Sequence, residues 1–323
     1  MASNRPQRRS WRMLTMMAGV AIITLFAGFT PASGAATASK ATPHATPPPL
    51  PPLPNPKINL ATPVHKLFLQ VQAAKDHMGW ELPQVKNLLP PPPSSIPLLP
   101  KAHAPNGAAT TTSLSDVRGM DVASYQGNVD WGLAALEGGK FAYVKATEGT
   151  YYNNPYFAQQ YNGSYNAGMI RGAYAFAVPS YSSGRTQAAY FVGSGGGWSP
   201  DGRTLPGMLD IEYNPYGPEC YGLSQPAMVG WIADFVNTYH ALTGRWAAIY
   251  STYKWWNDCT GNSPAFANND PLDIANYASN AGPLPAGWPY YTFWQYADSG
   301  TYPGDQDVFN GSQANLVTLA RNG

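Results

Sequence analysis

The stretch LPGMLDIE at residues 205–212 has the strongest bearing on the fold of this chain. It is apolar except at its end, where Asp210 and Glu212 stand on either side of Ile211. Successive side chains of a β-strand point to opposite faces of the sheet. We therefore expect Ile211 to pack beneath covering helices, while both carboxylates face the same open mouth.

Similar short apolar stretches lie on both sides of residues 205–212 and alternate with stretches of helical character. This alternation indicates an α/β fold with a parallel sheet. So many strands with short connections favour a closed barrel, in which the chemistry lies at the C-terminal ends of the strands. The predicted strands cover residues 118–123, 141–145, 170–177, 205–212, 246–250, 272–277 and 291–296, with a last short strand near Asp307. The predicted helices cover residues 131–136, 155–167, 184–192 and 225–242.

The N-terminus has the pattern of an export signal. Basic residues precede an apolar run at residues 13–29, and small residues follow it, with an A-x-A end at residues 36–38. The apolar run is near the short limit for spanning a membrane, which favours cleavage over a transmembrane anchor. We expect residues 1–38 to be a signal peptide and the remaining protein to be secreted, extracellular or associated with a cell wall, without stable membrane insertion. The Arg8-Arg9 pair leaves a twin-arginine route open beside the general one.

A proline-rich region follows at residues 39–114. Residues 41–100 hold 16 of the 32 prolines of the chain. Proline fixes φ and lacks an N–H donor, so these runs favour extended polyproline II and build no packed core. One short amphipathic helix could lie within residues 63–89. We interpret the region as a disordered linker or pro-region that precedes a globular domain at residues 115–323.

The composition limits the chemistry of that domain. A net charge of +1 gives no indication of a nucleic-acid partner. Aromatic residues make up 13% of the chain, which suits either stacking on sugar rings or a tyrosine-rich core. Cys220 and Cys259 are the only cysteines and have no CxxC spacing, so we expect one disulfide in an oxidising compartment and no metal site. No Ser-His-Asp arrangement or phosphate-binding loop is evident, and no cofactor is expected.

The D-x-E spacing of Asp210 and Glu212 suits acid–base chemistry. Two carboxylates so close cannot ionise independently, because burial and like charge raise the pKa of one of them. Glycoside cleavage requires such a pair, one group to protonate the leaving oxygen and an anion to support an oxocarbenium-like state. The alternative is a structural role in an ion pair or a helix cap. Taken alone, Glu148 and Asp307 suit that structural role better.

Five segments of this domain resemble the Chalaropsis-type lysozymes, glycoside hydrolase family 25. The resemblance extends from residue 117 to the end of the chain. It implies an irregular, TIM-like β/α barrel that hydrolyses the β-1,4 bond between N-acetylmuramic acid and N-acetylglucosamine. The partner would be the glycan strand of peptidoglycan, and nothing requires more than a monomer. The segments are GMDVASYQG (119–127), VKATEG (144–149), RGAY (171–174), LDIE (209–212) and FWQY (293–296).

The resemblance also implies residue roles. Glu212 would be the general acid, and Asp210 would orient the acetamido group of the substrate or stabilise a positive intermediate. Asp121 would support the site, and Asp307 matches the late aspartate of the family. The substrate-binding residues that it implies are Tyr174, Trp294 and Gln295.

Two residues depart from the family pattern. Ala175 stands where members often carry histidine or another large residue, and Asp273 stands where many carry tryptophan. Both put substrate affinity in question and keep open a non-catalytic, peptidoglycan-binding barrel. An enzyme on another amino-sugar polymer, such as chitin, is a further alternative, because an aromatic groove does not by itself distinguish the two polymers.

Overall fold

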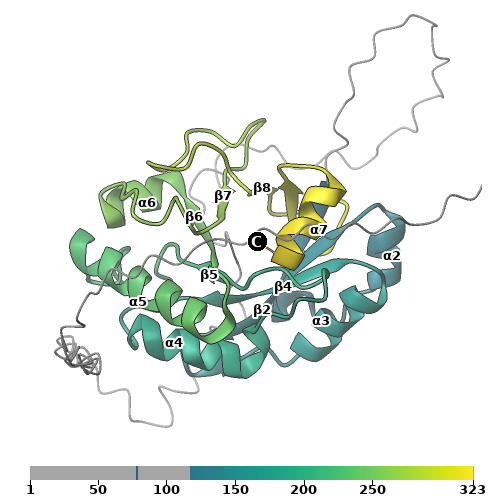
Figure 1. Cartoon of the computed structure of the whole chain (residues 1–323), viewed down its shortest axis with the longest axis horizontal. Helices are drawn as coiled ribbons and strands as arrows, with labels where there is room; N and C mark the ends of the chain where they lie inside the picture. The colour runs from purple at the N-terminus through teal and green to yellow at the C-terminus, as the bar shows by residue number, and fades with distance from the viewer. Residues whose placement is uncertain (1–77, 79–116, 323) are drawn as a thin grey trace, which may run out of the picture. The chain divides into compact units, whose positions relative to one another are not determined.

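Eight strands form a closed ring around the barrel axis (Figure 1). The structure is a computed structural model that describes Met78 and residues 117–322. Around the ring the order is β1, β2, β4, β5, β6, β7, β8 and β9, and the pairing of β1 with β2 closes it, so the predicted barrel is confirmed. The strands are β1 (Val117–Val122), β2 (Phe141–Glu148), β4 (Ile170–Phe176), β5 (Met208–Asp210), β6 (Ala248–Thr252), β7 (Leu272–Ala275), β8 (Phe293–Ala297) and β9 (Asp305–Phe309).

The barrel is irregular at one strand. Strand β9 runs antiparallel to both of its neighbours, β8 and β1, whereas all other neighbours in the ring are parallel. A two-residue strand, β3 (Tyr152–Asn153), pairs antiparallel with the end of β2 and lies outside the ring order. The irregular β/α barrel that the family resemblance implies is therefore the architecture of this chain.

Helices connect the strands and carry recognisable end signals. Asp130 caps α2, because its carboxylate accepts a 3.0 Å hydrogen bond from the Leu133 amide. Helix α5 has a proline in its first turn and ends at Gly244, whose φ of 75° is left-handed. The four predicted helices are confirmed with small shifts at their ends, while α6 and α7 were not predicted. The helices are α2 (Trp131–Leu136), α3 (Phe157–Asn166), α4 (Gly184–Phe191), α5 (Gln225–Thr243), α6 (Tyr253–Thr260) and α7 (Gln313–Asn322), with a 3-10 turn at Ser124–Gln126 and a π turn at Val192–Gly196.

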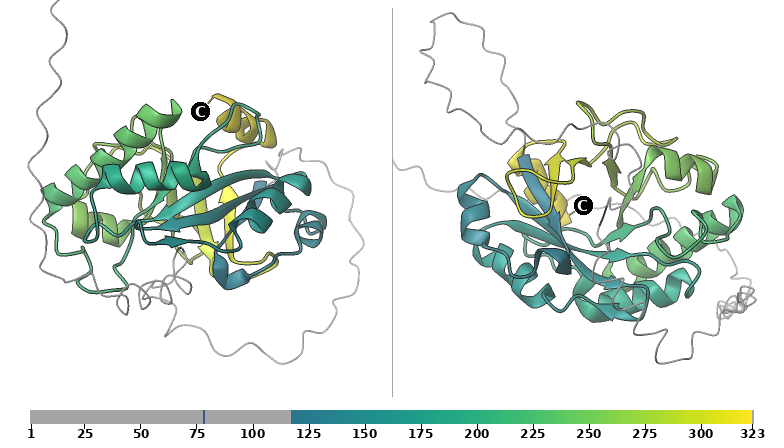
Figure 2. Two further views of the ribbon diagram at one scale, coloured as in Figure 1. Left: turned by 90° about the horizontal axis from the view of Figure 1, so that it is seen from below. Right: turned by 180° about the vertical axis from the view of Figure 1, so that it is seen from behind.

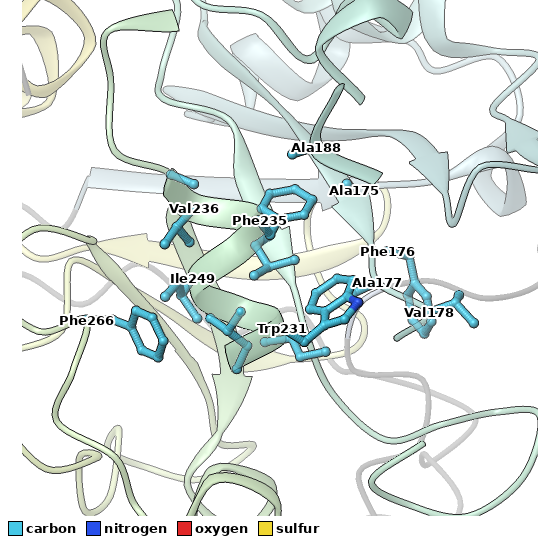
Figure 3. Packing of buried hydrophobic residues seen from close by; sticks show 14 of the residues in the cluster. Ala175, Phe176, Ala177, Val178, Ala188, Trp231, Phe235, Val236, Ile249 and Phe266 are labelled. Atoms are coloured by element: carbon cyan, nitrogen blue, oxygen red, sulfur yellow. The ribbon is translucent and has the colours of Figure 1, made fainter. Parts of the chain in front are cut away.

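The outer faces of the strands pack against these helices. Views from opposite sides show α3, α4 and α5 outside the ring of strands (Figures 1 and 2). Ile249 of β6 belongs to the same buried cluster as Trp231 and Phe235 of α5 (Figure 3). Leu209 and Ile211 belong to this cluster too, so Ile211 packs under the helices as predicted. We call this group of buried residues the outer core.

A second buried cluster, the inner core, fills the barrel. Its rings at one end come from Phe141, Phe293 and Phe309, with centroid distances of 5.2 Å and 5.3 Å along this series. Leu316 and Ala320 of α7 join the same cluster. Since Phe141 begins β2, helix α7 covers the end at which the parallel strands start. The opposite end, where these strands finish, is the place at which β/α barrels carry their active sites.

Several predictions lie outside the described residues. These are the signal peptide at residues 1–38, the proline-rich region at residues 39–114 apart from Met78, and the short helix within residues 63–89. Within the described part of the chain, no helix combines the length and apolar character that a membrane span requires.

Candidate active site

Asp210 and Glu212 lie on the inner side of the barrel at the end of β5. Met208 belongs to the inner core, whereas Leu209 and Ile211 belong to the outer core, so the even positions of this segment face inward. Neither Asp210 nor Glu212 exposes any surface. Burial, and after it the charge of Glu212, raises the pKa of Asp210 well above its usual value. The D-x-E spacing thus yields the close pair of carboxylates that the alternation of side chains predicts.

Asp210 lacks the hydrogen bonds that a buried carboxylate normally accepts. Neither of its oxygens has a hydrogen-bond partner among the residues that the structure describes. Burying a charged or polar group without partners is costly, so folded proteins seldom do it without reason. Lys145 is the nearby cation that lowers the pKa of Asp210, against the larger effect of burial. A strongly perturbed, unsatisfied carboxyl group in a barrel mouth marks a candidate functional site.

Glu148, at the end of β2, is fully partnered instead. Lys145 Nζ donates a 2.6 Å hydrogen bond to Glu148 Oε2, and both side chains are fully buried. The hydroxyl of Tyr151 donates to Glu148 Oε1 at 2.7 Å, and the hydroxyl of Tyr216 donates to the same oxygen. Lys145 Nζ also lies 4.9 Å from the centre of the Phe176 ring. These contacts give Glu148 the structural role that suits it when its sequence position is taken alone.

Lys145 pairs with Glu148 and also acts on the charge of Asp210. Nζ of Lys145 lies over the ring of Phe176. Phe176 is the residue of β4 that pairs with Asp210 of β5. The ammonium group is held by Glu148, so its position is set by the β2 side of the site. Its charge therefore acts on Asp210 from a fixed point. Sequence reasoning did not assign Lys145 to the site, although VKATEG was one of the family segments.

Gln295 joins the acidic residues of β1 and β9. Its Nε2 donates to Asp121 Oδ2 at 2.8 Å and lies 3.3 Å from Asp305 Oδ2. Its Oε1 accepts hydrogen bonds of 2.9 Å from the hydroxyls of Tyr250 and Tyr277. Asp121 and Asp305 are direct partners in the antiparallel pairing of β1 with β9. The structure thus brings together the predicted residues Asp121 and Gln295. It adds three residues that were not predicted, namely Tyr250, Tyr277 and Asp305.

Asp307 lies one inward-facing position deeper than Asp305. It pairs with Gly119, whereas Asp305 pairs with Asp121. Burial, followed by the charges of Asp121 and Asp273, raises the pKa of Asp307. Asp307 therefore shares the interior with Asp273, while Asp305 contacts Gln295. The D-x-D spacing at residues 305–307 is the sequence signal that could have included Asp305, because both positions face inward as Asp210 and Glu212 do.

Tyr174 and Trp294, both predicted to line the sugar groove, occupy different faces of the barrel. Tyr174 is buried in the inner core, and after burial the charges of Asp121, Asp210 and Asp305 raise its pKa. Trp294 packs against the outer core, and its Nε1 donates a 2.9 Å hydrogen bond to the Asn276 carbonyl. The structure therefore brings Tyr174, but not Trp294, to the carboxylates.

The two departures from the family pattern also lie on different faces. Ala175 is buried in the outer core, as is Ala188 of α4 (Figure 3), so it does not face the carboxylates. Asp273 is buried in the interior, where its pKa is raised by burial and then by Asp121. Of the two, only Asp273 can alter the charge of the site directly.

Cys220 and Cys259 form the predicted disulfide, with their Cα atoms 5.3 Å apart. Cys259 belongs to α6, and Cys220 lies in the connection between β5 and α5. The same connection carries Tyr216, which bonds to Glu148. The disulfide thus ties down the segment that completes the β2 side of the site. Among the described residues, no group of three or more histidine, cysteine, aspartate or glutamate side chains is arranged to hold a metal ion.

A family model matches most of the barrel in sequence. The model of the glycosyl hydrolases family 25 matches residues 120–305, from within β1 to the first residue of β9. The chain belongs to glycosyl hydrolase family 25. It is accordingly a glycoside hydrolase, and the resemblance found in its sequence motifs is confirmed.

Several similar proteins are named as muramidases or lysozymes. The chain is 50% identical over 208 residues to the N,O-diacetylmuramidase of Chalaropsis sp, covering 63% of this chain and 99% of that protein. It is 49% identical over 213 residues to Lysozyme M1 of Streptomyces globisporus, covering 64% and 72% of the two chains. Among solved structures, the muramidase from Acremonium alcalophilum is 55% identical, with a TM-score of 0.63 and coverage of 64% of this chain and 100% of that one.

Proposed function

We propose that this family 25 hydrolase is a secreted muramidase that cleaves the β-1,4 bond between N-acetylmuramic acid and N-acetylglucosamine in peptidoglycan. The observation that supports it most is the pair of buried, interacting carboxylates at the end of β5. The names of the relatives, N,O-diacetylmuramidase and lysozyme, support the same substrate. Secretion rests on the export pattern of residues 1–38.

Glu212 and Asp210 divide the work of bond cleavage in this proposal. Glu212 donates a proton to the glycosidic oxygen as the bond to the sugar breaks. Asp210 then faces the positive charge that develops on the sugar, or holds the acetamido group beside it. An anionic Asp210 serves either task, and the Lys145 ammonium favours that anion, against the larger effects of burial and of the Glu212 charge, which raise the pKa of Asp210. The hydrogen bonds that Asp210 lacks within the described chain would come from the substrate.

The β1 and β9 side supports the substrate in this proposal. Gln295 fixes the Asp121 carboxylate, and Tyr250 and Tyr277 fix Gln295 in turn. Tyr174 lies among the same acidic groups. Asp307 remains the proposed counterpart of the family's late aspartate, and Asp305 is a second candidate because it contacts Gln295. Comparing turnover by Asp305→Asn and Asp307→Asn would distinguish the two.

Mass analysis of fragments released from purified peptidoglycan tests the proposed function. We expect disaccharide-peptides that end in a reducing N-acetylmuramic acid. Chitin, incubated in parallel, should release no comparable products, and release from chitin alone would contradict the proposed substrate. Sedimentation with peptidoglycan in the absence of released fragments would contradict catalysis and support a binding barrel.

A further inference from the structure

Met78 lies far ahead of the barrel in sequence but is buried inside it. It stands 39 positions before Val117, the first residue of β1. It exposes none of its surface and belongs to the inner core together with Tyr174, Tyr250 and Ala275. A residue from outside the eight strands therefore shares the interior of the barrel with their side chains.

The surroundings of Met78 place it at the carboxylate end of the interior. Met78 packs in the same buried cluster as Tyr174, and its backbone amide lowers the pKa of the Tyr174 hydroxyl, against the larger effect of burial. The same hydroxyl experiences the charges of Asp121, Asp210 and Asp305. Tyr250, another member of the cluster, donates to Gln295, which contacts Asp121. Met78 therefore borders the residues that the proposed function assigns to the substrate.

Substrate needs the space that Met78 fills. A general acid acts only when it reaches the glycosidic oxygen within hydrogen-bond distance, directly or through one water. In this structure neither Glu212 nor Asp210 exposes any surface, and Asp121 exposes 1%. A sugar ring that contacts Asp210 and Tyr174 would have to displace the side chain beside Tyr174. Methionine suits such a position, because its flexible thioether fills irregular apolar gaps.

We propose that Met78 is an intramolecular inhibitor of the barrel that follows it in sequence. The mouth of the barrel is an interaction surface whose occupant is this chain's own residue, and the glycan gains access only when Met78 leaves. This inference rests on the proposed function, because it names what competes with substrate at the same site.

Turnover of peptidoglycan by the full chain tests the inhibition. Met78→Asp places a charge in an apolar pocket beside three carboxylates, so we expect it to release the site and raise the turnover rate about ten- to a hundredfold. Met78→Leu is the matched control, because it keeps an apolar side chain of similar volume; its rate should stay within about threefold of the natural chain. Equal rates for Met78→Asp and the natural chain would overturn the proposal.

Residues 115–323 alone provide the uninhibited reference. A chain of this extent is a whole protein in the relatives, since the match covers 99% of the Chalaropsis protein and 100% of the Acremonium structure. We expect this shorter chain to turn over as fast as Met78→Asp. Failure of the shorter chain to act on peptidoglycan would contradict the proposed function and not the occupancy of the barrel by Met78.

A measurement without substrate tests the occupancy itself. The chain has nine methionines, and the methyl resonance of Met78 can be assigned in a ¹³C-methyl-methionine spectrum by its loss in Met78→Leu. We expect this resonance to show ring-current shifts and contacts to the rings of Tyr174 and Tyr250. A Met78 methyl group at its solvent-exposed position in the spectrum would contradict the inference even if the enzyme is a muramidase.

Discussion

The ends of β2 and β5 present acidic side chains to the same interior, yet they differ in how those groups are satisfied. Glu148 accepts hydrogen bonds from Lys145, Tyr151 and Tyr216. Asp210 accepts none from the described residues, although it is just as deeply buried. Burial by itself therefore does not distinguish a structural carboxylate from a functional one.

The difference lies in what completes each group. A buried ion pair with additional hydrogen bonds is satisfied by the protein, and removing one partner leaves the other charge uncompensated. An unsatisfied carboxylate is held by the fold at a cost in stability, which is typical of sites built for a ligand. We therefore expect changes at the end of β5 to affect turnover, and changes at the end of β2 to affect stability.

The largest expected effect is at Glu212. Glu212→Gln should lower turnover of peptidoglycan by about two to four orders of magnitude, the usual scale for a lost general acid. The release of reducing ends measures it. Glu219→Gln is the matched control, because Glu219 is an exposed side chain that pairs with Lys254, and it should leave turnover unchanged. Full activity of Glu212→Gln would contradict the catalytic role proposed for the carboxylates at the end of β5.

Replacing each of the two carboxylates, Glu148 and Asp210, by its amide should give the next largest effects, on stability and on turnover respectively. Glu148→Gln should lower the free energy of unfolding by about 3–5 kcal/mol, because Lys145 loses its buried partner. Asp210→Asn should lose most turnover without loss of stability. The free energy of unfolding should not fall, because the pKa of Asp210 is raised in the folded protein. Ionisation of Asp210 at neutral pH therefore opposes folding, and asparagine does not ionise. Urea unfolding at pH 7, alongside turnover, measures both. Similar stability losses in the two variants would show that the end of β5 is structural as well.

The disulfide should contribute a stabilisation of comparable size. It closes a loop with a sequence separation of 39, for which chain entropy corresponds to about 4 kcal/mol, with engineered cases often lower. The double variant Cys220→Ser, Cys259→Ser should therefore unfold at lower temperature in a thermal scan. A reducing agent should lower the midpoint of the natural chain and leave that of the double variant unchanged. If the double variant unfolded at the same temperature as the natural chain, helix α6 and the Tyr216 segment would hold each other without the covalent link.

Asp270 offers the smallest effect on turnover and a test of burial without function. It precedes β7 at the end opposite the carboxylate site, and burial raises its pKa to about 8. A raised carboxyl pKa stabilises the fold at low pH, and this contribution is lost as the pH rises from about 4 to 8. Asp270→Asn should therefore be more stable than the natural chain at pH 8, by about 5 kcal/mol, with equal stability near pH 4. Chemical unfolding at both pH values measures the difference, and a variant equally destabilised at both would indicate a hydrogen-bonding role for Asp270. Turnover should not change.

The sequence predicted correctly which side chains face the barrel interior where the alternation of a single strand was considered. The predicted strand at residues 205–212 is shorter in the structure, where β5 ends at Asp210, but Ile211 and Glu212 continue its two-residue alternation, so Asp210 and Glu212 lie inward and Ile211 outward. The same two-residue period bears on two other expectations, those for Trp294 and Ala175. Trp294 is adjacent to Gln295, so both cannot face the carboxylates from one strand. Ala175 is likewise adjacent to Tyr174.

Helix α6 shows why some elements escaped prediction. It begins directly after β6, where the Thr252 hydroxyl accepts a hydrogen bond from the Trp255 amide. Its aromatic residues have modest helix propensity, and Trp255 and Trp256 are fully buried. Packing against the outer core, and the disulfide at Cys259, stabilise a helix that its local sequence does not announce.

The sequence by itself determined most of the elements, the inward face of the segment that carries Asp210 and Glu212, and the single disulfide that two cysteines can form, because these depend on local periodicity and on residue count. Only the tertiary structure decided which inward positions meet. The closed ring sets Asp305 opposite Asp121, holds Gln295 against both, and brings Lys145 of β2 near Asp210 of β5. Strand register around a barrel depends on pairings between residues distant in sequence, and so do the burial and mutual charge that give each carboxyl group its properties. The placement of Met78 inside the barrel likewise depends on contacts between residues distant in sequence.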